Sequence, residues 1–224
     1  MTLNLWKAMI KKLLNILQNL IFSTIGDHIK PGSFKRTMDI AFVLFEKIAF
    51  AFEDASKFYI NVYQEIVDKE LRLLNDYQLQ NMLVVGSGSI PATPILLAKK
   101  SNAQIVCIDI DKHAIQKSQH VIKRMNLDDK ISVKSGDGIH FSYDDYDAIF
   151  ILYGMKSQKE IIDSLSESLP KKIPVILRVV PQDDNALIDN TPFDLSTLFT
   201  IKGKVRSHSW GLLDSYLLER KLEK

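Results

Sequence analysis

The spacing of hydrophobic positions changes near residue 80. Before that point, apolar residues recur every three or four positions, which is the period of an amphipathic helix, with a break at Lys30-Pro31-Gly32. After it, short apolar runs alternate with helical segments, the pattern of a parallel sheet with crossover helices. The chain is therefore predicted to contain a helical N-terminal subdomain, residues 1–79, followed by an α/β domain, residues 80–224.

The same pattern predicts individual elements. In the helical segment, one helix is expected from about Leu5 to Leu20, a second from Ser33 into the fifties, and a third from about Ser56 to Tyr77. The expected helices of the second part are Thr93–Lys100, Lys112–Met125 and Gln158–Leu169. The expected strands are Met82–Val85, Gln104–Ile108, Ile131–Val133, Ala148–Leu152, Val175–Val179, Phe199–Ser207 and Leu213–Arg220. The last two strands follow one another without a helix, so they are predicted to close the sheet as an antiparallel pair across Ser209-Trp210-Gly211.

The first predicted strand leads into a glycine-rich turn, residues 86–94. Gly86 and Gly88 allow positive φ and close approach of the backbone to a ligand. Thr93 followed by Pro94 predicts a helix start, with the threonine as cap and the proline at the first helical position. A turn of this kind can hold a nucleotide-like ligand, although any strand-to-helix turn can use glycines. The candidate ligand-binding residues of the turn are Gly86, Ser87, Gly88, Pro91 and Thr93.

An acidic residue ends the second predicted strand. Asp109 follows Gly86 by roughly 20 residues, the spacing at which an acid accepts hydrogen bonds from both ribose hydroxyls of a nucleoside. Ile110 beside it is a further candidate contact. Asp111 is better placed to cap the helix that starts near Lys112. NAD and FAD are disfavoured, because their fingerprint needs a third glycine where this chain has a proline without an N–H.

Composition and charge narrow the function classes. A 46% hydrophobic and 25% charged chain of 224 residues is an ordinary globular protein, and a net charge of +2 without an aromatic-interleaved basic stripe predicts no nucleic-acid partner. Cys107 lies in an apolar run and is expected to be a core residue. The N-terminus lacks a signal-peptide pattern, which predicts a cytoplasmic protein. The most apolar window, 40–52, is short and contains Glu46-Lys47, so no membrane contact is expected. The histidines show no metal-ligand spacing.

The alternating pattern that ends in an antiparallel pair resembles the fold of the S-adenosylmethionine-dependent methyltransferases. The resemblance implies an α/β fold with a doubly wound Rossmann-like sheet and an antiparallel last strand, and it implies S-adenosylmethionine as cofactor. It also implies that Asp137 accepts from the exocyclic amine of adenine while the backbone amide of Gly138 meets the ring. Tyr153, which follows the fourth strand, would lie at the same edge of the sheet.

Two segments resemble nicotianamine synthases more closely. The turn 85–93 is similar to the Gly-Ser-Gly-Pro-Leu-Pro-Leu-Thr turn of that family, including its late proline and threonine. Upstream, Tyr59, Tyr63 and Glu70 resemble a family pattern of tyrosines followed, seven residues later, by a glutamate. Ser89 and Val62 depart from the family, which leaves the product more open than the cofactor.

That resemblance implies transfer of the aminocarboxypropyl arm to an amine, with release of methylthioadenosine. Glu70 would be the general base, and Tyr63 would orient the substrate or the cofactor arm. The expected partner is a small-molecule acceptor, whose product can itself chelate metals. Methyl transfer to a small molecule and a non-catalytic scaffold or binding protein remain the alternatives, and a homodimer through the N-terminal helices is a further possibility.

Overall fold

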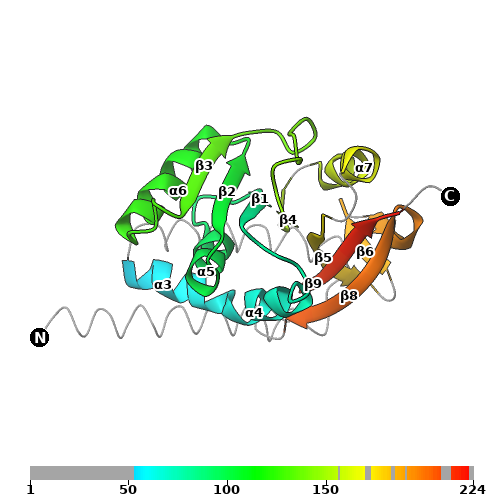
Figure 1. Cartoon of the computed structure of the whole chain (residues 1–224). Coiled ribbons are helices and arrows are strands. Elements are labelled where there is room, and N and C mark those ends of the chain that lie inside the picture. Colours follow the sequence, from blue (N-terminus) through cyan, green and yellow to red (C-terminus); the bar gives the residue numbers. More distant parts are fainter. Residues whose placement is uncertain are drawn as a thin grey trace, which may run out of the picture.

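The computed structural model describes residues 53–155, 157–169, 173–182, 185–189, 191–207 and 213–221. A twisted β-sheet lies between two groups of helices in these ranges (Figure 1). The first two predicted helices and the predicted turn at residues 209–211 lie outside the described residues.

The centre of the sheet is parallel. β1 (Asn81–Val85) lies between β2 (Gln104–Asp109) and β4 (Ala148–Ile151), while β3 (Ile131–Ser135) and β5 (Val175–Gln182) lie outside these two. Four consecutive residues are buried in both β1 and β4, as expected for strands that are covered on both faces. All five strands were predicted from their apolar runs.

The last two strands confirm the predicted antiparallel closure. β9 (Leu213–Arg220) pairs antiparallel with β5 on one side and with β8 (Phe199–Ser207) on the other. A hairpin formed by β6 (Asn185–Ile188) and β7 (Thr191–Phe193) extends β5, and a short η1 (Leu195–Thr197) follows it. The hairpin was not predicted, because a three-residue strand that contains a proline leaves no periodic apolar signal.

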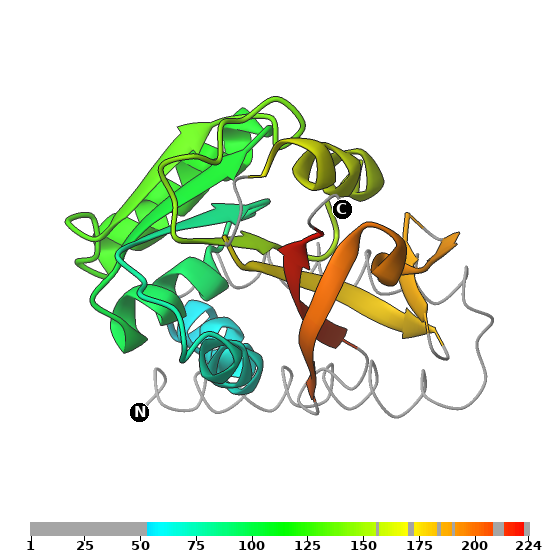
Figure 2. The ribbon, with the colours of Figure 1, turned by 45° about the vertical axis from the view of Figure 1, so that its right-hand side comes forward.

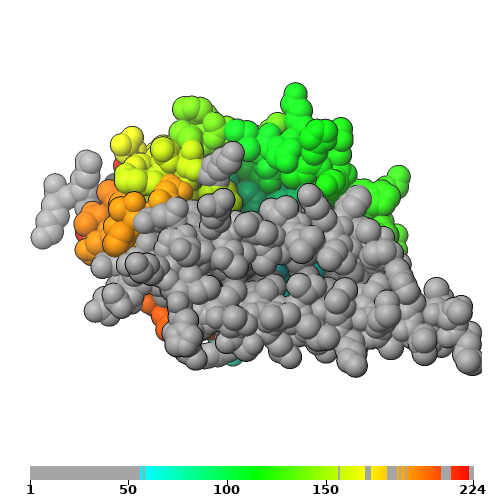
Figure 3. All heavy atoms as spheres, turned by 180° about the vertical axis from the view of Figure 1, so that it is seen from behind, coloured from blue at the N-terminus to red at the C-terminus, as the bar shows by residue number. Residues whose placement is uncertain are grey.

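Helices cover both faces of the sheet. On one face lie α3 (Glu53–Val62), α4 (Gln64–Leu73), α5 (Ala92–Lys100) and α6 (Lys112–Arg124), and on the other lies α7 (Gln158–Ser168) (Figure 2). Seen from behind, the green residues around β3 and α6 and the orange residues around η1 and β8 lie at opposite ends of the described surface (Figure 3). The sheet therefore extends across the described part of the molecule, from β3 to β8.

The third predicted helix was wrong in its extent. Instead of one helix from Ser56 to Tyr77, α3 and α4 are separated at Tyr63, whose N–H donates to the carbonyl of Ile60, three residues back, at 3.1 Å. The second helix ends at Leu73, and the N–H of Leu74 bonds to two carbonyls of the last turn. This interruption places Tyr63 at the junction of the two helices.

The described part of the helical segment shares one core with the sheet. Ile66 and Val67 of α4 are fully buried in the same hydrophobic cluster as Met82, Val84 and Phe150 of the central strands. α4 also contacts β8, β9 and α5. Residues of α4 that face the sheet, Glu70 among them, are therefore held against the strands.

Cys107 is fully buried in β2, and burial, followed by the charge of Asp109, raises the pKa of its thiol, which fits a core residue. None of the helices in the described part of the chain has both the length and the apolar character needed to span a membrane.

Candidate active site

The turn after β1 has the backbone that its glycines predicted. Gly86 has φ +77° and Gly88 has φ +68°, both in the left-handed region that favours glycine. A Cβ placed on Gly86 would lie 3.1 Å from the Cε of Met155, so this methionine packs over the turn. Met155 was not anticipated from the sequence, where nothing distinguishes it from a core residue.

Ser87 lies between the two glycines and is buried. Within the described residues, its Oγ has no hydrogen-bond partner. An unsatisfied buried hydroxyl costs about 1–3 kcal/mol, so native proteins seldom leave one without a protein, water or ligand partner. This hydroxyl is therefore available to a ligand bound in the turn.

The start of the next helix differs from the prediction. α5 begins at Ala92 with Pro91 as its N-cap, and no side chain caps it, so the expected cap role of Thr93 was wrong. Because the helix starts earlier, Thr93 lies in its first turn, where it is buried. Its Oγ1 instead accepts a hydrogen bond from Nη1 of Arg178 at 2.7 Å.

Asp109 connects the end of β2 to the glycine turn. Its Oδ2 accepts from the N–H of Gly88 at 2.9 Å, and its Oδ1 accepts from the N–H of Asp111 at 3.0 Å. Each carboxylate oxygen has a second lone pair, and the side chain is half-buried, so both oxygens can also accept from ribose hydroxyls. Asp111 caps α6 as predicted, by accepting from the N–H of His113, and Ile110 is 74% exposed.

The loop after β3 is tightly folded around its second glycine. Oδ1 of Asp137 accepts from the N–H of Ile139 at 3.0 Å, and the Tyr143 hydroxyl donates to the carbonyl of Gly138. A Cβ on Gly138 would lie 2.9 Å from Cγ1 of Val85, so no larger residue fits beneath the loop. The loop is therefore pressed against the end of β1.

Parallel pairing brings these loops to one edge of the sheet. Val85, at the end of β1, pairs with Ile108 of β2 and with Ile151 of β4. Ligands of open parallel sheets bind at this carboxyl edge. The predicted cofactor residues at this edge are Gly86, Ser87, Gly88, Pro91, Thr93, Asp109, Ile110, Asp137, Gly138 and Tyr153.

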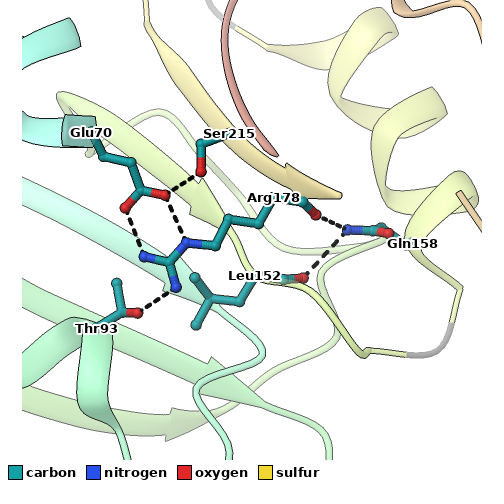
Figure 4. A network of polar contacts seen from close by, with 6 residues as sticks. All are labelled: Glu70, Thr93, Leu152, Gln158, Arg178 and Ser215. Carbon is teal, nitrogen blue, oxygen red and sulfur yellow. Dashed lines mark hydrogen bonds and ion pairs between the residues drawn. The ribbon is translucent and has the colours of Figure 1, made fainter. Parts of the chain in front are cut away.

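Glu70 lies at the centre of a buried polar network (Figure 4). Its carboxylate forms a bidentate ion pair with Arg178 of β5: Nε lies 2.6 Å from Oε1, and Nη2 lies 2.6 Å from Oε2. The hydroxyl of Ser215 on β9 donates to Oε1 at 2.6 Å. Arg178 and Ser215 are register partners, so antiparallel pairing of β5 and β9 sets both donors against one carboxylate.

The charges of this pair support each other. Arg178 is only 2% exposed. Burial alone would lower the pKa of its guanidinium, but the charge and hydrogen bonds of Glu70 more than offset burial, and the pKa is raised above its ordinary value. Removing either partner would leave an uncompensated charge in the core.

The two tyrosines predicted from the sequence lie beside this pair. The Cζ of Arg178 is 5.7 Å from the centroid of the Tyr63 ring, within cation–π range. The hydroxyls of Tyr59 and Tyr63 are 3.2 Å apart, and their rings contact at 5.2 Å between centroids. Tyr59, Tyr63 and Glu70 are thus brought together around Arg178.

Sequence reasoning missed Arg178, Ser215 and Gln158. The Nε2 of Gln158 donates to the carbonyls of Leu152, at 3.3 Å, and of Arg178, at 3.0 Å, and so joins β5 to the chain leaving β4. One signal was available: Arg178 interrupts the apolar run 175–180, and an arginine inside a buried strand needs an acidic partner. The sequence alone does not identify that partner.

Metal binding has no support in the part of the chain that the structure describes. No group of three or more His, Cys, Asp or Glu residues is arranged there to hold a metal ion.

Comparison with known proteins places this geometry in a wider context. No family model matches the chain. An L-histidine 2-aminobutanoyltransferase from Yersinia pestis is 26% identical over 73 residues, which is 33% of this chain and 28% of that protein. The match therefore spans less than a third of that relative's length.

Solved structures resemble the chain over a larger part of its length. MtNAS, a nicotianamine synthase, was crystallised as a Glu-to-Gln mutant in complex with S-adenosylmethionine, and superposes with a TM-score of 0.72 at 15% identity, covering 96% of this chain and 92% of that chain. An RNA methyltransferase from Salinibacter ruber, in complex with S-adenosyl-L-homocysteine, gives a TM-score of 0.54 at 17% identity, covering 71% and 94%. The chain has the fold of the S-adenosylmethionine-dependent methyltransferases, which nicotianamine synthase shares.

Proposed function

We propose that this chain is an S-adenosylmethionine-dependent transferase that moves the aminocarboxypropyl arm of the cofactor to the amine of a small-molecule acceptor. The observation that carries the proposal is the buried Glu70–Arg178 pair. Glu70 lies on the helix before the glycine turn, and Arg178 has Tyr63 beside it and donates to Thr93 in the first turn of α5. A buried carboxylate next to a cofactor turn is suited to accept a proton from an amine.

The turn and its neighbours fit S-adenosylmethionine. Gly86 and Gly88 let the backbone approach a ligand, the Ser87 hydroxyl lacks a partner among the described residues, and Asp109 can accept from ribose hydroxyls. When bound, the cofactor supplies a sulfonium leaving group, so that a nitrogen–carbon bond replaces the carbon–sulfur bond and the electron pair departs with methylthioadenosine.

Glu70 would receive the proton of the acceptor amine. Three donor contacts hold its carboxylate in place, and among the described residues Oε2 accepts only one of these bonds, so it retains a lone pair. Tyr63, packed over Arg178, would orient the acceptor or the cofactor arm. In this scheme the enzyme acts mainly by orientation, because the sulfonium activates each attached carbon and in-line placement selects one.

The acceptor class is proposed from the relative's name. The Yersinia pestis protein is named as a transferase that acts on L-histidine and moves a 2-aminobutanoyl group, which has the same four-carbon amino-acid skeleton as the aminocarboxypropyl arm of S-adenosylmethionine. We therefore propose an α-amino acid as acceptor. Dimerisation through the N-terminal helices stays a prediction, because residues 1–52 lie outside the described residues.

The nucleoside product tests this proposal. The protein is incubated with S-adenosylmethionine and the proteinogenic amino acids, and the spent cofactor is separated by chromatography. Methylthioadenosine is expected. S-adenosylhomocysteine would instead identify a methyltransferase, and calorimetric binding of S-adenosylmethionine without any product across the acceptors would favour a binding or scaffold protein.

A pair of variants tests the role of Glu70 in the same assay. Glu70→Gln should abolish turnover while S-adenosylmethionine still binds, because the amide cannot accept the proton. Glu167→Gln makes the same change on the exposed side of α7 and should retain full turnover. Full activity of Glu70→Gln would reject its role as base.

A further inference from the structure

Arg178 contacts both the candidate base and the helix that follows the cofactor turn. We infer that Arg178 is a positioning residue: it keeps Glu70 ionised and fixes the carboxylate relative to the glycine turn. This inference rests on the proposed function for its catalytic meaning, but the contacts that carry it are in the structure.

The guanidinium acts as a rigid bridge between α4 and α5. Nε and Nη2 both donate to Glu70 at 2.6 Å, and Nη1 donates to Thr93 at 2.7 Å. All three nitrogens lie in one plane, so the side chain sets the distance between Glu70 and Thr93 and also balances the charge of Glu70. A lysine ammonium has a single nitrogen, so it could not form the bidentate pair and reach Thr93 with the same geometry.

The backbone of Arg178 is held from the opposite side. Gln158, which is 3% exposed, donates to the carbonyl of Arg178 and to that of Leu152, which directly follows β4. The arginine is therefore fixed at its backbone by the β4 edge and at its side chain by α4 and α5. Ser215 adds a second donor to Oε1 of Glu70 from β9.

Arg178 is the cation that forms the ion pair with Glu70. Around the pair, Tyr59 and Tyr63 face it from the α3–α4 junction, Thr93 from α5 and Ser215 from β9. Other ion pairs of α4 and β8, among the described residues, are Lys69–Glu65, Lys100–Asp68, Lys202–Glu219, Lys204–Asp214 and Arg206–Asp214. A buried carboxylate that loses its cation takes up a proton at higher pH, because burial disfavours the charged form.

The decisive experiment follows the ionisation of Glu70 directly. Glutamate labelled at its carboxyl carbon is incorporated into the full chain, and the Glu70 resonance is assigned by its loss in Glu70→Gln. In Arg178→Lys and Arg178→Met, the pH midpoint of this resonance should rise by at least about 1 unit relative to the unmodified chain. Arg206→Met removes an arginine from another carboxylate, Asp214, and should leave the Glu70 midpoint unchanged.

Kinetics give the second readout. Both Arg178 variants should lower kcat/KM at neutral pH by about 10–100-fold and move the acid limb of the pH profile upward. Thr93→Val removes only the bond to Nη1. It should lower kcat without moving the acid limb, and it keeps the proposal testable if both Arg178 variants fail to fold. An unchanged kcat in Thr93→Val would overturn the bridging role.

These outcomes separate the inference from the proposed function. A Glu70 midpoint that is identical in Arg178→Lys and the unmodified chain overturns the inference, even if methylthioadenosine is the product. If the product is S-adenosylhomocysteine, the proposed function fails, and the resonance measurement still decides whether Arg178 controls the ionisation of Glu70.

Discussion

The two halves of the candidate site are built in different ways. The cofactor half consists of backbone geometry and local acids: two glycines with positive φ, and Asp109 tied to the Gly88 amide. The acceptor half consists of side chains that are far apart in sequence, with Glu70 and Arg178 108 positions apart and Glu70 and Ser215 145 apart. They meet at Thr93, which lies in the first turn of α5, directly after the glycine turn, and accepts a hydrogen bond from Arg178.

This difference has an energetic counterpart. Damage to the cofactor half removes contacts to a ligand and leaves most of the fold intact. Damage to the acceptor half leaves a charge without its partner between the sheet and α4, so it should lower stability as well as turnover.

Arg178→Met should destabilise the protein most. It leaves the fully buried Glu70 carboxylate without its cation, at a cost of about 3–5 kcal/mol in the free energy of unfolding, measured by urea denaturation. The double variant Glu70→Leu/Arg178→Met removes both charges and should recover a large part of that loss. A loss below about 1 kcal/mol in the single variant would mean that the pair is not buried in solution.

Asp109→Ala should separate ligand binding from stability. Loss of a charged acceptor for the ribose hydroxyls should weaken S-adenosylmethionine binding by about 1.5–3 kcal/mol, or at least about tenfold in Kd, as measured by calorimetry. Because Asp109 is only half-buried, its loss should cost less unfolding free energy than that of Arg178. Unchanged affinity would reject Asp109 as the ribose ligand.

Asp214→Asn tests an ion pair of intermediate burial. Asp214 is fully buried, but its partners Arg206 and Lys204 are 51% and 37% exposed, so solvent screens the pair and the variant should cost about 1–2 kcal/mol. Burial would raise the pKa of Asp214, but the hydrogen bonds and charges of Arg206 and Lys204 lower it overall.

The sign of the pH effect follows from that shift. Since the folded pKa of Asp214 lies below its ordinary value near 3.8, its contribution is present above pH 3.8 and is lost as the pH falls through the folded pKa. The free energies of unfolding of Asp214→Asn and of the unmodified chain, measured by urea denaturation, should therefore differ by less at pH 2.5 than at pH 6. An equal difference at both pH values would contradict the pairing.

Tyr77→Phe should have the smallest effect. The Tyr77 hydroxyl donates to Oε1 of Glu219 at 2.5 Å near the protein surface, so its loss should cost about 0.5–1.5 kcal/mol at neutral pH. Burial, then the bond and charge of Glu219, raise the pKa of Tyr77 to about 12. The contribution of Tyr77 to the free energy of unfolding should accordingly be lost as the pH rises from 10 to 12. Denaturant curves at pH 10 and pH 12 should show this loss in the unmodified chain and not in Tyr77→Phe.

The sequence predicted the parts of the molecule that rest on local chemistry. β8 and β9 were predicted with their observed bounds, and the glycines of the turn have the expected backbone. The prediction that Thr93 caps α5 was wrong. A threonine before a proline favours capping locally, whereas in the folded chain a tertiary bond to Arg178 uses the Thr93 hydroxyl.

The acceptor half could be predicted only in part. The tyrosines and the glutamate were visible as a pattern on one helical segment, but the break at Tyr63 and the partner of Glu70 were not. Arg178 was visible as a charge in an apolar strand, and its need for a partner was predictable, but that partner lies 108 positions away in the sequence, where no local pattern identifies it.

The direct test of the central claim is to follow which carbon leaves the cofactor. S-adenosylmethionine with a deuterated methyl group and a carbon-labelled carboxyl group is incubated with the protein and amino acids, and both products are examined by mass spectrometry. The account predicts that the carboxyl label moves to the acceptor while the deuterated methyl stays with the nucleoside as methylthioadenosine. A deuterated methyl group on the acceptor, with the carboxyl label left on S-adenosylhomocysteine, would contradict it.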